Sequence, residues 1–193
     1  MSTVKTNSLD TRDLNTTIDV LPQYTLYSPG AIIQVIQTYL IDPFSQSIPA
    51  SYNTYTDITG LAATITPKST SSKIYISVRW SGEMNPMSGM LWDSMFNLKR
   101  GGSLIGQPSQ PGTLNIGIMM GGLTYYANDN DSTPETASFD YYDSPSSTSA
   151  LTYQVALSST QSGTLYTNRC VNGAISGTYE RLTSSIILME IAG

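Results

Sequence analysis

Hydrophobic and polar residues alternate most regularly over residues 56–80, where two strands are predicted on either side of a polar turn. Leu61, Ala63 and Ile65 fall on one face of the first strand, and the even-numbered residues from Ile74 to Trp80 on one face of the second. A period of two marks half-buried β-strands. Residues 67–72 (PKSTSS) have the composition of a turn, so this region predicts an all-β protein.

Two further segments are apolar on both faces. Residues 32–41 (IIQVIQTYLI) are rich in β-branched residues and stop at Asp42-Pro43, which favours a strand covered on both sides over a helix. Residues 182–191 close the sequence with the run Ile186–Met189. That strand is expected either in the centre of a sheet or buried between subunits.

The remaining pattern predicts more short strands and no helix. Strands are expected around residues 92–98, 103–105, 114–123, 151–157 and 164–171, with a hairpin turn at Gly101-Gly102. Loops are expected at residues 44–53, 81–90 and 124–150, and both Trp80 and Trp92 are expected in the core. This spacing indicates a jelly-roll-like β-sandwich over residues 30–193.

Residues 1–29 differ from this domain, since they are polar, contain few aliphatic residues and show no lasting period. We expect either an extended arm that becomes ordered on the surface of a partner or a plain disordered tail. Residues 1–8 contain no apolar core of a signal peptide, which predicts synthesis in a cytoplasm without the usual export.

Composition narrows the classes of function. The net charge is −5, only 12% of residues are charged and lysines and arginines form no block, which argues against a nucleic-acid partner. No apolar run is long enough for a membrane span. The sequence has no histidine, which removes the commonest general base and metal ligand, and a single cysteine, Cys170, which we expect to be buried. Neither a catalytic site nor a cofactor or metal is therefore predicted.

Residues 124–150 hold the only candidate chemistry. The run of residues 128–131 (NDND) predicts either a solvated turn or a calcium loop that does not follow the EF-hand pattern. Asp140 and Asp143 could form the carboxylate pair of a glycosidase. The neighbouring aromatic residues could instead contact a glycan without cleaving it, or belong to an ordinary loop. The candidate glycan contacts are Tyr125, Tyr126, Tyr141 and Tyr142.

Several stretches resemble tail-fibre-like virion proteins of phages, especially phages of aquatic bacteria and cyanobacteria. These stretches are residues 1–9 (MSTVKTNSL), 28–35 (SPGAIIQV), 55–67 (YTDITGLAATITP), 69–78 (STSSKIYISV), 177–182 (GTYERL) and 185–191 (SIILMEI). They cover the first 80 and the last 20 or so residues, and leave the middle uncovered. They are structural signatures rather than catalytic motifs.

The resemblance implies a trimeric jelly-roll domain on a virion, attached to other virion proteins by its N-terminal segment. A trimer would also cover strands that are apolar on both faces. The expected interface residues are Ile33, Val35, Ile187, Met189 and Ile191. Two placements remain open, a capsid cement protein whose arm clamps neighbouring capsid subunits and a short tail fibre or receptor-binding protein that adheres to a host glycan. The absence of a shaft favours the capsid.

Overall fold

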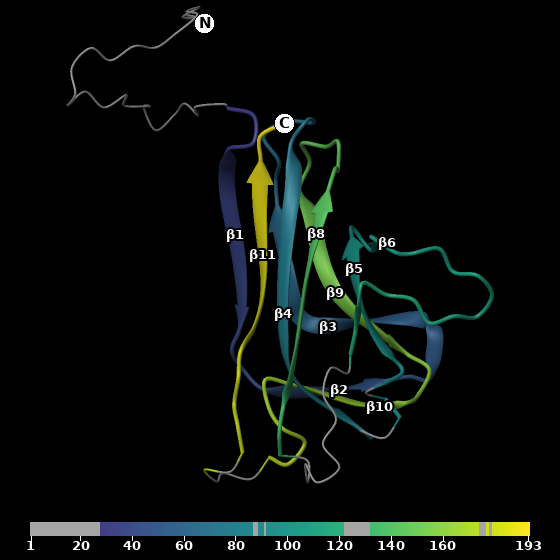
Figure 1. Ribbon diagram of the computed structural model, residues 1–193. Coiled ribbons are helices and arrows are strands. Elements are labelled where there is room, and N and C mark those ends of the chain that lie inside the picture. Colours follow the sequence, from purple (N-terminus) through teal and green to yellow (C-terminus); the bar gives the residue numbers. More distant parts are fainter. Residues whose placement is uncertain (1–27, 87–88, 91, 122–131, 174–176, 178) are drawn as a thin grey trace, which may run out of the picture.

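The computed structural model describes residues 28–86, 89–90, 92–121, 132–173, 177 and 179–193. All regular structure in these ranges is β-strand, which confirms the all-β prediction. The strands form two curled antiparallel sheets that pack face to face (Figure 1).

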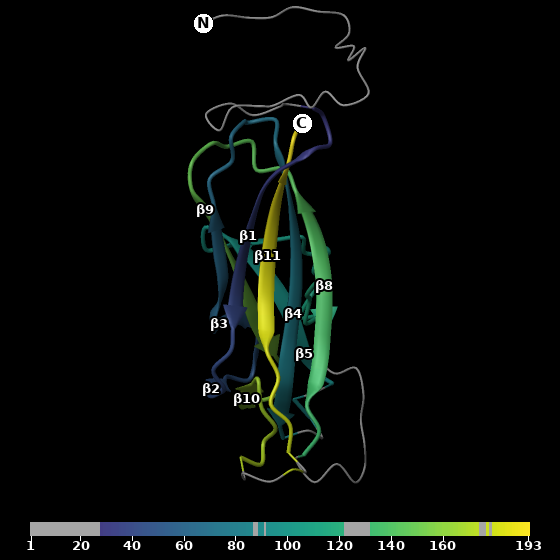
Figure 2. The same ribbon diagram turned by 90° about the vertical axis from the view of Figure 1, so that its left-hand side faces the viewer.

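The first sheet presents four long strands side by side, as Figure 2 shows. They follow the order β1 (Ile32–Leu40), β11 (Ser184–Ile191), β4 (Lys73–Asn85) and β8 (Glu135–Asp143). The far end of β4 pairs in addition with β10 (Gly163–Thr167), and β10 pairs with β2 (Phe44–Ile48). The central place of β11 in this sheet agrees with its apolar sequence.

The second sheet lies behind the first. Its strands are β3 (Ser51–Ile65), β9 (Leu151–Ser159), β5 (Ser94–Arg100) and β6 (Ser103–Ile105), with β7 (Met119–Met120) also paired to β5. The hairpin between β5 and β6 turns at Gly101 and Gly102, as predicted. Both glycines have positive φ values, 55° and 86°, which a two-residue hairpin turn requires.

The connectivity is that of a rolled-up hairpin. The first strand pairs with the last, β1 with β11, and nested inside this pair are β3 with β9, β4 with β8 and β5 with β7. Rolling the nested pairs brings β11 beside β4 and β9 beside β5, which closes the two sheets. This arrangement is a jelly roll, as the strand spacing indicated.

The register of the first sheet places both ends of the described domain together. Ile32 lies opposite Ile191, Ile191 opposite Lys73, and Ile74 opposite Asp143. Beyond this row, the Gly30 N–H donates to the Ala192 carbonyl at 2.8 Å. We call this the terminal end of the sandwich. The last residues of β1 and β4 lie at the opposite end.

The core lies between the sheets and is built from the alternating residues that the sequence places on one face. Ile74, Ile76 and Trp80 of β4 are fully buried. The Trp80 ring packs on Phe96 of the other sheet, with 5.2 Å between ring centroids. Its indole N–H donates to the hydroxyl of Thr167 at 3.1 Å, so the buried polar atom of the side chain is satisfied.

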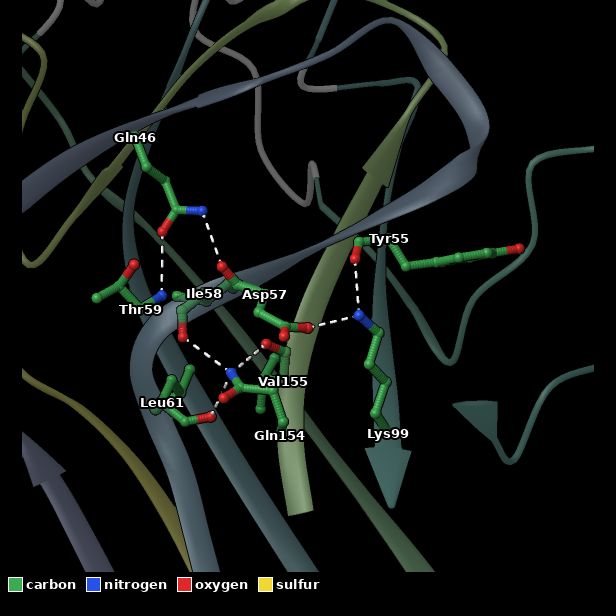
Figure 3. Close-up of polar contacts among 9 residues, drawn as sticks. All are labelled: Gln46, Tyr55, Asp57, Ile58, Thr59, Leu61, Lys99, Gln154 and Val155. Atoms are coloured by element: carbon green, nitrogen blue, oxygen red, sulfur yellow. Dashed lines mark hydrogen bonds and ion pairs between the residues drawn. The ribbon is translucent and has the colours of Figure 1, made fainter. Parts of the chain in front are cut away.

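Strand β3 bends through a bulge between Asp57 and Ala62, which lets it turn at the edge of the sandwich (Figure 3). The amide of Gln154 donates to the carbonyls of Ile58 and Leu61, which the bulge removes from the ladder. Gln46 of β2 bonds both the Asp57 carbonyl and the Thr59 N–H. Side-chain amides thus take the place of the backbone hydrogen-bond partners that these residues lack at the bend.

Three predicted loops are wrong in whole or in part. Residues 44–53 form β2 and the start of β3, and β4 continues through residues 81–85. Within residues 124–150, β8 occupies Glu135–Asp143. There, Ala137 and Phe139 face the core while Thr136, Ser138 and Asp140 are exposed, so the strand has a period of two that its polar composition concealed. Conversely, of the strand expected at 114–123 only Met119–Met120 is strand among the described residues.

Two burial predictions also need correction. Trp92 is 49% exposed, because it precedes the first residue of β5 and so lies outside the alternation that buries Phe96. Strand β1 is the edge of its sheet and only its inner face is covered, which leaves Val35 and Tyr39 each 53% exposed. The strand expected to be covered on both sides therefore has one open face in a single chain.

Candidate functional site

The outer face of the first sheet carries a continuous row of apolar and aromatic side chains that are partly exposed. Val35 on β1, Met189 on β11, Tyr75 on β4 and Tyr142 on β8 lie directly opposite one another in register. They form one row across all four strands, with Val35 53% and Tyr142 52% exposed at its two ends. Ile32 and Ile191 form the next pair toward the terminal end. We call these six residues the apolar band.

Strand alternation explains why these side chains point outward. The odd-numbered residues of β11 are on the outer face, because Ile186 and Leu188 are fully buried in the core while Ile187 and Met189 are half-buried. The residues on either side of Tyr75 are likewise buried. Contiguous exposed apolar surface of this kind is uncommon on monomeric proteins and marks interaction sites.

The band brings together most of the residues expected at a trimer interface. Val35, Met189 and Ile191 belong to it, and Ile187 lies one row further from the terminal end. Ile33 lies at an irregularity of the β1 ladder, where the register shifts between Ile32 and Gln34. Tyr75 and Tyr142 complete the row on the other side of β11. Sequence reasoning did not include Tyr75, because only the register shows that it aligns with Met189.

Beside the band, the same face is hollowed. We call this depression, which has a volume of about 420 Å³ and is open to solvent, the polar hollow. Its lining side chains come from all four strands and occupy two successive rows. On the outer face they are Gln37, Tyr39, Ser77, Arg79, Ser138, Asp140, Ser185 and Ile187. The three serines lie between larger side chains and so account for the depression.

A cation and an anion line the polar hollow without pairing. The Arg79 guanidinium donates to the hydroxyl of Thr183 at 3.1 Å. Among the described residues, neither Arg79 nor Asp140 takes part in an ion pair. Their charges therefore face solvent within one depression. Sequence reasoning placed Arg79 on the outward face but assigned it no role.

The two carboxylates considered for glycosidase chemistry do not share a site. Asp140 is exposed on the outer face of β8, whereas Asp143 is 6% exposed and faces inward. An odd spacing along a strand puts the two on opposite faces of the sheet. Asp143 is moreover occupied, since it accepts two hydrogen bonds from Arg100 and one from the Tyr153 hydroxyl at 2.6 Å. The pair therefore lacks the geometry of a catalytic acid and nucleophile.

The candidate glycan contacts are divided in the same way. Tyr142 is exposed in the apolar band, whereas the adjacent Tyr141 faces inward and packs against the core. The two rings therefore do not form one platform. Tyr125 and Tyr126 lie outside the described residues, as does the possible calcium loop of residues 128–131.

The remaining candidate chemistry is structural. Cys170 is buried, as expected, and burial raises the pKa of its thiol. Its sulfur lies 3.0 Å from the Ser132 carbonyl and accepts a hydrogen bond from the Glu180 N–H. Within the described ranges, no three or more His, Cys, Asp or Glu side chains are grouped as metal ligands would be. No helix that could cross a membrane occurs there either.

Neither a protein-family model nor a curated protein sequence matches the chain.

Proposed function

We propose that this chain is a non-enzymatic structural protein of a bacteriophage virion. In this proposal three copies associate through the apolar band and the N-terminal segment, residues 1–29, attaches the trimer to neighbouring capsid subunits as a cement protein. The observation that carries the proposal is the apolar band. The first and last strands of the jelly roll, β1 and β11, both contribute side chains to this exposed surface.

The physical reason for association is the cost of leaving this face in water. Burying apolar surface contributes about 25 cal/mol per Å². Four strands about 4.8 Å apart make the band about 14 Å wide between its outer strands, enough for the centre of an interface. A stable interface buries about 800 Å² on each partner, so surface between the band and the terminal end must also take part. Met189 in the band suits such a contact, because methionine adapts to irregular surfaces.

The orientation of the domain supports the attachment role. The Ser28 carbonyl accepts a hydrogen bond from Ala31, and Gly30 is bonded to Ala192, so the chain enters the domain at the terminal end. The apolar band lies nearest this end. A chain of 27 residues before Ser28 could reach about 90 Å when extended, far enough to cross a subunit boundary.

The alternative is a short tail fibre or receptor-binding protein that uses the same segment for attachment and contacts a host glycan. Attachment at the terminal end would leave the opposite end of the sandwich free. The residues that flank 87–88 and 122–131 lie toward that opposite end (Figure 1). Locating labelled protein on intact particles, on head or on tail, decides between the two placements.

Sedimentation of the full chain at micromolar concentration tests the association. We expect a trimer, and we expect Val35→Asp and Met189→Asp to dissociate it, because each places a charge in the interface. Leu114→Asp is the matched control, since Leu114 is 57% exposed but belongs to the segment between β6 and β7. A stable single-copy species at this concentration would contradict the trimer.

A second experiment tests attachment separately. Removal of residues 1–27 leaves every described contact of the domain in place, so the truncated protein should still form trimers. We expect it to be absent from particles assembled in its presence. Incorporation at the level of the full chain would rule out the attachment role and leave the trimer untouched.

A further inference from the structure

The polar hollow has the chemistry of a ligand site that is separate from the apolar band. Its rim consists of Gln37 and Tyr39 on β1, Arg79 on β4 and Asp140 on β8. All four residues are exposed and none makes a side-chain hydrogen bond that closes the depression. Its lining combines a cation, an anion, an amide, hydroxyl groups and an aromatic ring.

The spacing of the two charges indicates what could join them. Ser77 lies opposite Asp140 and Arg79 lies opposite Ser138, so Arg79 and Asp140 are diagonal neighbours on adjacent strands. Diagonal positions are about 7–8 Å apart. A ligand between them must offer acceptors to the guanidinium and donors to the carboxylate within the width of one sugar ring.

The other wall of the hollow is aromatic. Tyr39 is 53% exposed and lies opposite Ser185, whose small side chain leaves its ring uncovered from that side. An exposed ring offers an apolar face with a polar tip. Gln37, on the next row, can both donate and accept hydrogen bonds.

We propose that the polar hollow binds a saccharide unit that carries a carboxylate, a uronic acid. The ligand carboxylate forms a two-pronged hydrogen bond with the Arg79 guanidinium, a geometry that arginine provides. Hydroxyl groups of the sugar donate to Asp140 and bond with Gln37, and the sugar ring lies against Tyr39. The neutral serines at the floor add hydroxyl partners without a competing charge.

This inference goes beyond the proposed virion role and does not depend on it. The hollow occupies the two rows that follow the Val35–Met189 row away from the terminal end. Of the tyrosines considered from the sequence, the two that the structure describes, Tyr141 and Tyr142, do not line it.

Calorimetric titration of the full chain with digalacturonic acid at low ionic strength tests the site. The neutral disaccharide galactobiose is the matched probe and should bind at least about tenfold more weakly, because a charge-assisted hydrogen bond is lost. Arg79→Ala should weaken digalacturonic acid binding by about tenfold or more, and Arg79→Lys by less. Arg181→Ala removes another exposed arginine and should change nothing.

Three results would overturn the proposal. They are the absence of binding at millimolar digalacturonic acid, equal affinity for the neutral disaccharide, and unchanged binding by Arg79→Ala. Arg79 is exposed, so we expect its variants to fold, and circular dichroism together with the sedimentation experiment above confirms that fold and association are intact. If the full chain binds digalacturonic acid but sediments as a single copy, the result would count against the trimer only.

Discussion

Arg100 of β5 and Asp143 of β8 form a two-pronged ion pair that joins the two sheets of the sandwich. One guanidinium nitrogen lies 2.9 Å and 2.7 Å from the two carboxylate oxygens of Asp143. The Ser144 N–H and the Tyr153 hydroxyl also donate to this carboxylate, so each of its oxygens is satisfied. Strand β8, which lies in a segment expected to be a loop, thus supplies one half of a polar connection between the layers.

Removal of Arg100 should strongly destabilise the domain. The Asp143 side chain is 7% exposed, and Arg100→Ala would leave its charge buried without a cation. Loss of one partner of a fully buried pair costs about 3–5 kcal/mol. Because the Arg100 side chain is 31% exposed, we expect a smaller loss of about 2–4 kcal/mol in the free energy of unfolding, measured by urea denaturation. Asp57→Asn is the control, because Asp57 is 55% exposed and the 16% exposed Lys99 keeps its hydrogen bond to the Tyr55 carbonyl, so the change should cost at most about 1 kcal/mol. Equal losses in the two variants would contradict the structural role of the buried pair.

Raising the pH should reveal how much Tyr153, which belongs to the same network, contributes to stability. Burial, and next the hydrogen bond to Asp143, raise the pKa of Tyr153 well above its ordinary value of 10.0. The folded state therefore holds this proton more tightly than the unfolded state. Its contribution to stability is complete below about pH 10 and is lost as the pH rises further. Tyr153→Phe should be less stable at pH 7, by about 1–3 kcal/mol, but should lose less stability between pH 9 and pH 11. An unchanged alkaline slope in the variant would refute this assignment.

Acid pH should act through Glu190, which connects β11 to β1 and to the turn after β3. Burial alone would raise the pKa of this carboxylate. Hydrogen bonds from Ser72, from Gln34 and from the Lys68 N–H outweigh burial and lower its pKa overall.

Because the folded pKa of Glu190 lies below the unfolded one, its contribution to stability is present above about pH 4.5 and is lost as the pH falls. We expect Glu190→Gln to be less stable than the original chain at pH 7 and to differ less from it at pH 3, as measured by urea midpoints. Asp42→Asn, an exposed carboxylate, serves as the control. A constant difference across this range would show that Glu190 contributes no pH dependence.

Gly82 should tolerate no side chain. A Cβ atom there would overlap the Tyr166 carbonyl on β10 and lie 2.7 Å from the Trp80 ring. Gly82→Ala should therefore separate β10 from β4 and lower the free energy of unfolding by about 1–3 kcal/mol or more. Gly177→Ala meets no atom within 4 Å and should be neutral. Thermal melting of the two variants side by side checks this difference.

Alternation along single strands predicted the fold class and the inward faces. Ile74, Ile76 and Trp80 are buried as their spacing indicates, and the hairpin at Gly101 follows from its residue types. These features depend on neighbours within a few residues, which a sequence displays directly.

The apolar band as a whole could not be predicted from the sequence, because its composition depends on how distant strands pair. Val35, Met189 and Tyr142 are far apart in the chain and align only through strand register. Strand β8 was hidden, because Pro134, Pro145 and the polar residues around them suggest a loop when the pairing of this segment with β4 is unknown. Cross-strand order is a property of long-range pairing, so the polar hollow could not be found from local pattern.

The adjacency of the first and last strands has a mechanical consequence. Because β1 and β11 run antiparallel and meet at Gly30 and Ala192, forces that separate the two termini would peel their hydrogen bonds apart one after another. A tension applied to residue 28 and resisted by the opposite end of the sandwich would instead shear the whole ladder at once. The domain should thus unfold at low force when it is pulled by its two ends, and at higher force when it is pulled between residue 28 and the opposite end of the sandwich. Single-molecule pulling in the two directions would measure this difference.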